Sequence, residues 1–178
     1  RRGVRVRVVA ADLARPMLEN LARRKRGGRG RWGRLGGAVQ PVLADAAMPP
    51  VRPGRMDGAV VSFGIRNVDD FRRCLVNVSR VLGRGGLLAV LEFSMPGRQP
   101  LRWLYRFYFK HVLPLLGRFL FDAGGAYTYL PDSVERFPSG SAFEDELRAA
   151  GFAPVSSRPL FGGIVTLYLA RAGAPGEG

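Results

Sequence analysis

Apolar runs with the composition of β-strands alternate with helical patterns along the chain, and this alternation limits the fold more than any other feature. The runs predict strands near residues 5–11, 38–43, 57–63, 85–93, 152–159 and 163–171. Between them, residues 14–26, 68–82 and 141–152 place apolar side chains at helical spacing. Regular alternation of this kind is typical of an α/β doubly wound sheet, in which we expect the first four strands to be parallel.

Several local signals refine these elements. Pro41 interrupts the second apolar run, so that run is expected to be an edge strand. Asp69 and Asp70 are expected in the first turn of the second helix, and Gly151 is expected to end the third. Gly64 follows a buried strand and is expected to permit either a tight bend or a close approach by another group there.

The length of 178 residues and a hydrophobic content of 47% predict one globular domain over residues 1–178. Within it we expect a helical insertion near residues 98–130 and a disordered tail over residues 172–178. The single cysteine, Cys74, excludes an internal disulfide. No metal site is expected.

The formal net charge is +14, and most of the excess lies near the start of the chain. Half of the 28 Lys and Arg residues, but only three of the 14 acidic ones, precede residue 56. The run "RRKRGGRGRWGR", residues 23–34, could bind nucleic acid or anionic lipid. It could equally be a solvated helix end and a Gly-rich loop. Because Trp32 is its only aromatic residue, we favour the solvated surface and expect no nucleic-acid partner.

Polar or small residues follow four of the predicted strands, at the edge where ligands of such sheets bind. They are Asp12, then Asp45 with Ala46, then residues 62–67, and finally Glu92, Phe93 and Ser94. A carboxylate in this position can accept both hydroxyl groups of a ribose. An Asp after a strand is also a common turn former, so the joint arrangement is better evidence than any single residue.

Five stretches together resemble the family of quinone-biosynthesis C-methyltransferases, over about residues 4–171. They are "FGIRNV", "SRVLGRGGLLAVLEFSMP", "HVLPLLG", "YTYLPDSVERFP" and "LRAAGF". Enzymes of that family methylate demethylmenaquinol or the benzoquinol precursor of ubiquinone. The resemblance implies a Rossmann-like class I methyltransferase sheet whose last strand inserts antiparallel. It also implies S-adenosylmethionine (AdoMet) as methyl donor and a polyprenyl quinol as acceptor.

The resemblance also implies roles for individual residues. Asp12 matches the acidic ribose ligand, Asp45 and Ala46 match the adenine-side pair, and Ser62 matches the binding serine that ends a strand. The candidate catalytic residues are Arg66 and Asn67, which could hold a phenolate or a water, and His111, the only histidine. Other interpretations are a solvent-facing arginine, a helix N-cap and a packed or surface histidine, respectively.

Class I methyltransferases carry a first strand, a Gly-rich loop and a helix before the acidic strand. The sequence begins with "RRGVRVRVVAAD", about where that helix should end. We therefore expect an N-terminally truncated sheet that lacks the first strand and first helix, and weak AdoMet binding by this chain alone.

Residues 101–121 are apolar, yet Arg102, Arg106 and Lys110 share one helix face and Pro114 interrupts the run. A lid over the acceptor pocket, an interfacial helix and an inserted core helix all fit this pattern. We expect a cytoplasmic protein with peripheral contact at the inner face of the cell membrane.

Three other functions fit parts of the sequence: a non-catalytic methyltransferase fragment that packs on a partner, a basic nucleic-acid-associated module, and a methyltransferase for sterols or phospholipid amines. Methylation of base amino groups usually requires an Asn/Asp-Pro-Pro-aromatic run, which residues 62–65 do not form. The pattern leaves open the choice between menaquinone and ubiquinone precursors, the tail length and the oligomeric state.

Overall fold

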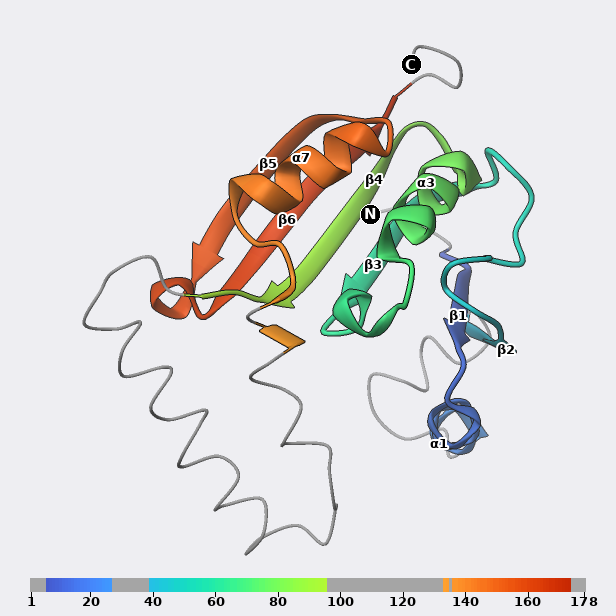
Figure 1. Cartoon of the computed structure of the whole chain (residues 1–178). Helices are drawn as coiled ribbons and strands as arrows, with labels where there is room; N and C mark the ends of the chain where they lie inside the picture. Colours follow the sequence, from blue (N-terminus) through green and yellow to red (C-terminus); the bar gives the residue numbers. More distant parts are fainter. Residues whose placement is uncertain (1–5, 27–38, 96–132, 135, 174–178) are drawn as a thin grey trace, which may run out of the picture. The chain divides into compact units, whose positions relative to one another are not determined.

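A computed structural model describes residues 6–26, 39–95, 133–134 and 136–173 (Figure 1). The chain divides into two compact units, Arg1–Val51 and Arg52–Gly178, and each is described by itself. His111 and the predicted helical insertion at residues 98–130 lie outside the described residues. The expectation of a single domain therefore stays a prediction.

The first unit contains a two-stranded parallel sheet and a helix. Strand β1 (Val8–Asp12) pairs with β2 (Val39–Leu43), and Pro41 lies opposite Ala10. Helix α1 (Arg15–Arg26) carries Pro16 in its first turn, where a backbone N–H would have no partner within the helix. In the described part of this unit β2 pairs with β1 alone, as expected for a strand that contains proline.

The second unit is built on a four-stranded sheet of order β3-β4-β6-β5. Its strands are β3 (Met56–Ser62), β4 (Leu82–Phe93), β5 (Phe152–Leu160) and β6 (Val165–Ala172). β3 and β4 are parallel, whereas β6 runs antiparallel to both of its neighbours. The predicted strands are thus confirmed, and so is the antiparallel insertion of the last strand.

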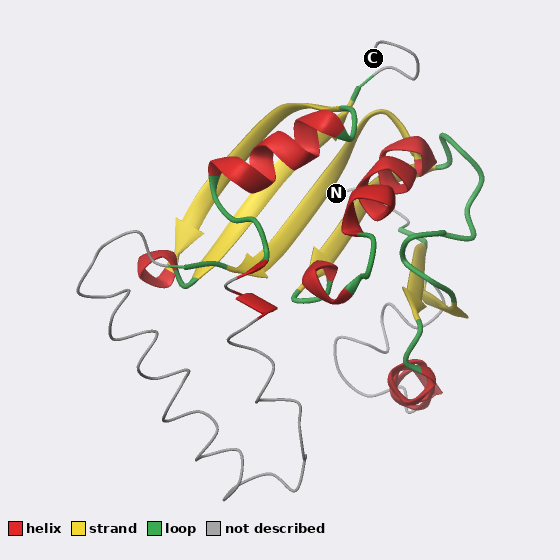
Figure 2. Ribbon diagram, in the orientation of Figure 1, coloured by secondary structure: helices red, strands yellow, loops and turns green. Residues whose placement is uncertain are grey.

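Two helices, α3 (Phe71–Val81) and α7 (Ser141–Ala149), pack on the same face of this sheet (Figure 2). The core between helices and sheet is formed by large apolar side chains, among them Leu75, Leu88, Val90, Phe143, Leu147, Phe152 and Tyr168. Val60 and Leu169 point to the opposite face of the sheet and are 80% and 38% exposed.

Two boundaries differ in detail from the sequence prediction. Asp69 and Asp70 precede α3, and Asp70 is its N-cap, whose carboxylate accepts a hydrogen bond from Arg73 N at 2.9 Å. An aspartate at the N-cap can reach this free N–H, which one inside the first turn could not do as well. β6 continues through Ala172, which pairs opposite Phe152, so the predicted tail begins inside the sheet.

Gly151 lies just beyond the end of α7 and has φ +88°, the left-handed conformation that ends many helices. This confirms its predicted role as a stop. In the ranges that the structure describes, no helix is long and apolar enough to cross a membrane.

Candidate active site

The turn after β3 has an unusual backbone. Phe63 has φ +54°, in the left-handed region, whereas Gly64 has φ −125°. The expectation of a tight bend at Gly64 is therefore wrong, whereas a close approach by another group at Gly64 stays a prediction. Phe63 N donates to Leu91 O at 2.8 Å, and its ring lies 4.6 Å from that of Phe93. These contacts hold a conformation that costs a non-glycine residue about 1–2 kcal/mol, and such strain gathers at functional sites.

The short 3-10 helix η1 (Ile65–Asn67) follows this turn and directs Arg66 inward. The Arg66 side chain is only 7% exposed, and its Nη1 lies 2.5 Å from Glu92 Oε1 and 3.0 Å from Phe63 O. Its guanidinium also lies over the ring of Phe93, 5.2 Å from the centroid. The interpretation of Arg66 as a solvent-facing residue is therefore wrong.

Asn67 is exposed at the end of η1, and its backbone N donates to Gly64 O at 3.0 Å. Because Asp70 caps α3, Asn67 is not the helix N-cap. Asn67 instead lines the same cavity as Arg66.

Glu92 is the partner that sequence reasoning did not assign. It is 1% exposed near the end of β4, and its Oε1 also accepts a hydrogen bond from Phe93 N at 2.9 Å. Parallel pairing puts Ser62 opposite Leu91, so the residues that follow the two strands are neighbours. The sequence signal that could have identified Glu92 is a carboxylate placed directly after a continuous apolar run.

A cavity of about 580 Å³ opens beside Arg66, within the second unit. Its walls are formed by two arginines, aromatic rings and short polar side chains: Arg66, Asn67, Val68, Asp69, Phe71, Ser133, Arg136, Phe137 and Pro138. The rings of Phe71 and Phe137 lie 5.1 Å apart. A cavity of this size, in which two phenylalanine rings lie beside several polar and charged side chains, suits an aromatic ligand with polar substituents.

Arg66 Nε is buried and has no hydrogen-bond partner in the described part of the chain. A buried donor without a partner is costly, and in a cleft it indicates a ligand that supplies the acceptor. Arg66 therefore combines a fixed position, a positive charge and an unused donor.

Asp12 is the last residue of β1 and Asp45 follows β2, so both lie at the same end of the two-stranded sheet. Ala44 N donates to Asp12 O at 3.1 Å, which ties the two strand ends together. Asp12 Oδ1 accepts from Ala14 N and Asp45 Oδ1 accepts from Ala47 N, each at 2.8 Å. Both side chains thus act as turn formers through Oδ1, while their Oδ2 atoms take no part in these bonds.

The carboxylates at this edge are open to hydrogen-bond donors. Asp12 is exposed, Asp45 is half-buried, and the small Ala46 in the turn after Asp45 is exposed, so hydroxyl and amino groups could approach both carboxylates. Ser62 ends β3 in the second unit and is exposed. The convergence of Asp12, Asp45 and Ser62 on one cofactor stays a prediction. No group of three potential metal ligands occurs in the described ranges.

The fold is that of class I AdoMet-dependent methyltransferases. A solved SAM-dependent methyltransferase from Thermotoga maritima superposes with a TM-score of 0.58, over 93% of this chain and 82% of that one, at 18% sequence identity. The more particular assignment comes from the sequence. The ubiE/COQ5 methyltransferase family model matches residues 2–171, and the chain belongs to this family.

Two curated relatives support the assignment. The ubiquinone/menaquinone biosynthesis C-methyltransferase UbiE of Syntrophotalea carbinolica is 41% identical over 97% of this chain. The demethylmenaquinone methyltransferase of Thermus thermophilus is 43% identical over 82% of it. The chain spans 70% and 63% of the lengths of these two proteins.

Proposed function

We propose that the protein is an AdoMet-dependent C-methyltransferase that methylates a demethylmenaquinol or a related polyprenyl quinol in menaquinone or ubiquinone biosynthesis. Membership of the ubiE/COQ5 family and the names of its relatives support the reaction class. The observation that carries the proposal is Arg66, a buried arginine in the wall of a cavity lined by two phenylalanine rings, whose Nε has no hydrogen-bond partner among the described residues.

A quinol ring fits the chemistry of this cavity. Phe71 and Phe137 supply aromatic walls for a flat ring, and the Arg66 guanidinium supplies a charge-assisted donor for one of its oxygens. A ring carbon becomes nucleophilic when the neighbouring phenol loses its proton. Arg66 therefore favours the reactive form, since its positive charge stabilises the phenolate.

AdoMet supplies an electrophilic methyl group when it is bound. The residues of the chain contribute alignment, which can lower a barrier by roughly 7–11 kcal/mol when both reactants are held in line. Asn67 adds a short polar side chain beside Arg66 that can hold the same oxygen or a water. His111 stays a candidate proton acceptor outside the described residues.

The acceptor site is tested by methyl transfer from AdoMet to demethylmenaquinol. Arg66→Gln is expected to lower kcat roughly 10²- to 10³-fold, the usual loss when one donor to a developing oxyanion is removed. Arg84→Gln, which removes an exposed arginine from β4, is the matched control and should leave kcat unchanged. Equal rates in Arg66→Gln and the parent would contradict the proposal.

We further propose that Asp12, Asp45, Ala46 and Ser62 bind AdoMet. Asp12→Asn should weaken the binding of S-adenosylhomocysteine roughly 10- to 150-fold, because a hydrogen bond to a charged group is worth about 1.5–3 kcal/mol. Titration calorimetry measures this directly. Glu19→Gln, an exposed carboxylate on α1, is the control. Unchanged affinity in Asp12→Asn would remove Asp12 from the site.

A further inference from the structure

Glu92 lies behind Arg66, outside the cavity, and none of the roles above includes it. We propose that Glu92 is a positioning residue, which fixes the Arg66 guanidinium at the cavity wall and sets how strongly that charge acts on a phenolic oxygen. The inference rests on the proposed function, because it assumes that the cavity takes a phenol.

The carboxylate of Glu92 is held in place by its own element and by the turn that carries Arg66. Oε1 accepts from Phe93 N at 2.9 Å and from Arg66 Nη1 at 2.5 Å, while Oε2 lies 3.5 Å from the backbone N of Arg66. Because Glu92 is 1% exposed, water cannot replace these partners. The carboxylate therefore determines where the guanidinium lies.

Arg66 is restrained from three directions. Glu92 and Phe63 O both accept from Nη1, and the Phe93 ring lies under the guanidinium carbon. These contacts occupy one end and one face of the planar group. Nε, on another edge, is buried and has no hydrogen-bond partner among the described residues, so it is the donor that a ligand could still satisfy.

The charges around Arg66 come from three segments. Glu92 on β4 contacts it directly, Asp69 lines the cavity just after η1, and Arg136 lines it from residues 133–138. Of these, only Glu92 is buried, and buried charges are screened least. Glu92 therefore has the largest effect on the field of Arg66.

A coloured phenol reports this field without any methyl transfer. The probe is 4-nitro-1-naphthol, a two-ring phenol whose phenolate has its own visible absorption band. In the parent chain the pKa of the bound probe should fall below that of the free probe, because Arg66 favours the phenolate. Arg66→Gln should abolish this depression.

Two Glu92 variants should then move the pKa of the bound probe in opposite directions. Glu92→Gln keeps the length and an oxygen acceptor but removes the negative charge, so the pKa should fall further, by about one unit. Glu92→Asp keeps the charge but shortens the side chain. It should draw the guanidinium back and raise the pKa toward that of the free probe.

A merely structural role would lower the thermal stability of both variants without shifting the pKa of the probe in opposite senses. Asp145→Asn, which neutralises an exposed carboxylate paired with Arg148 on α7, is the matched control and should leave the pKa of the probe unchanged. Thermal unfolding of every variant confirms that the comparison is made on folded protein.

The outcomes separate the two proposals. If the probe does not bind to the parent, or if its pKa does not shift there, both the acceptor site and the role of Glu92 are overturned. If Arg66→Gln abolishes the shift while the two Glu92 variants leave it unchanged or move it in the same direction, only the role of Glu92 is overturned.

Discussion

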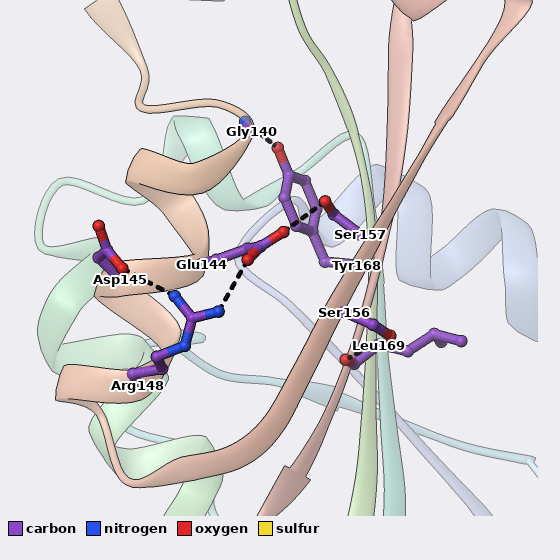
Figure 3. A network of polar contacts seen from close by, with 8 residues as sticks. All are labelled: Gly140, Glu144, Asp145, Arg148, Ser156, Ser157, Tyr168 and Leu169. Carbon is purple, nitrogen blue, oxygen red and sulfur yellow. Dashed lines mark hydrogen bonds and ion pairs between the residues drawn. The ribbon is translucent and has the colours of Figure 1, made fainter.

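Tyr168 shows how one side chain joins a helix to the sheet. It is 2% exposed on β6, and its hydroxyl accepts a hydrogen bond from Gly140 N at 2.7 Å (Figure 3). Gly140 precedes α7 and has no side chain with which to cap it. The hydroxyl thus satisfies a backbone donor just before the helix. The same burial raises the pKa of Tyr168 above its ordinary value.

Tyr168→Phe should lower the free energy of unfolding by about 1–2 kcal/mol, because Gly140 N loses its acceptor while the packing against Phe143 is kept. Urea unfolding measures the change. Ser156→Ala is the control, since Ser156 Oγ lies 3.4 Å from Leu169 O in an exposed position (Figure 3). It should change stability by no more than about 0.5 kcal/mol. Equal losses in the two variants would show that the Gly140 contact is not specific.

At the scale of elements, β4 begins with an irregular stretch that contains three glycines. Met56 pairs with Leu82 and Gly58 with Leu87, so the intervening residues of β4 bulge out of register. Gly85 has φ +74°, and a Cβ on Gly86 would lie 2.8 Å from Gly83 O. The bulge therefore needs glycine at these two positions.

Gly86→Ala should destabilise the protein by about 1–3 kcal/mol, as overpacking in a tight site does. Gly83→Ala is a matched control in the same strand, because its Cβ would lie 3.6 Å from the nearest atom, an ordinary contact. Thermal unfolding of the two variants compares them directly. A loss in Gly83→Ala as large as that in Gly86→Ala would mean that alanine disturbs the bulge generally.

Helix α7 is anchored by its glutamates, and this predicts a dependence on pH. Ser157 and Arg148 lower the pKa of Glu144, and Arg72 lowers that of Glu146 (Figure 3 shows the Glu144 contacts). Both carboxylates favour the folded state when ionised. Their contribution is therefore full above the unfolded-state pKa of about 4.3 and is lost as the pH falls through the lowered values.

The double variant Glu144→Gln, Glu146→Gln should unfold with a weaker dependence on pH than the parent between about pH 5 and pH 3. The two proteins should converge in stability at the acid end of this range. Denaturant unfolding at a series of pH values measures both slopes. Parallel curves would show that these two glutamates do not contribute to acid sensitivity.

For the molecule as a whole, the net charge of +14 affects how the protein would reach a polyprenyl quinol. Such a quinol resides in the membrane, and anionic headgroups attract basic surfaces. We expect the chain to bind anionic liposomes, and binding should fall as salt rises because the attraction is screened over roughly 8–10 Å. Sedimentation with anionic and neutral vesicles measures this.

A matched pair of triple variants tests which basic residues bind the liposomes. Neutralising Arg102, Arg106 and Lys110 to Gln should weaken liposome binding, whereas neutralising the exposed Arg52, Arg55 and Arg84 removes the same charge and should weaken it less. An equal effect of the two triples would indicate net charge alone. Equal recovery with neutral vesicles at every salt concentration would refute the electrostatic account.

The sequence by itself determined the elements and their kind. The apolar runs around β3, β4 and β6 and the helical spacing of α3 are local patterns, because burial on a sheet or helix face imposes a period of 2 or 3.6. The motif "FGIRNV" likewise pointed to Arg66 before any contact was known.

The tertiary structure alone determined which carboxylate pairs with the Arg66 guanidinium. Glu92 is 26 residues away in sequence, and the two meet because β3 and β4 pair in parallel, with Ser62 opposite Leu91. The apolar pattern of a strand shows which face is buried, but it does not identify the distant strand that pairs with it. The left-handed backbone conformation of Phe63 could not be predicted from the sequence for the same reason. Leu91 and Phe93 of the neighbouring strand hold this conformation, which a non-glycine residue otherwise disfavours.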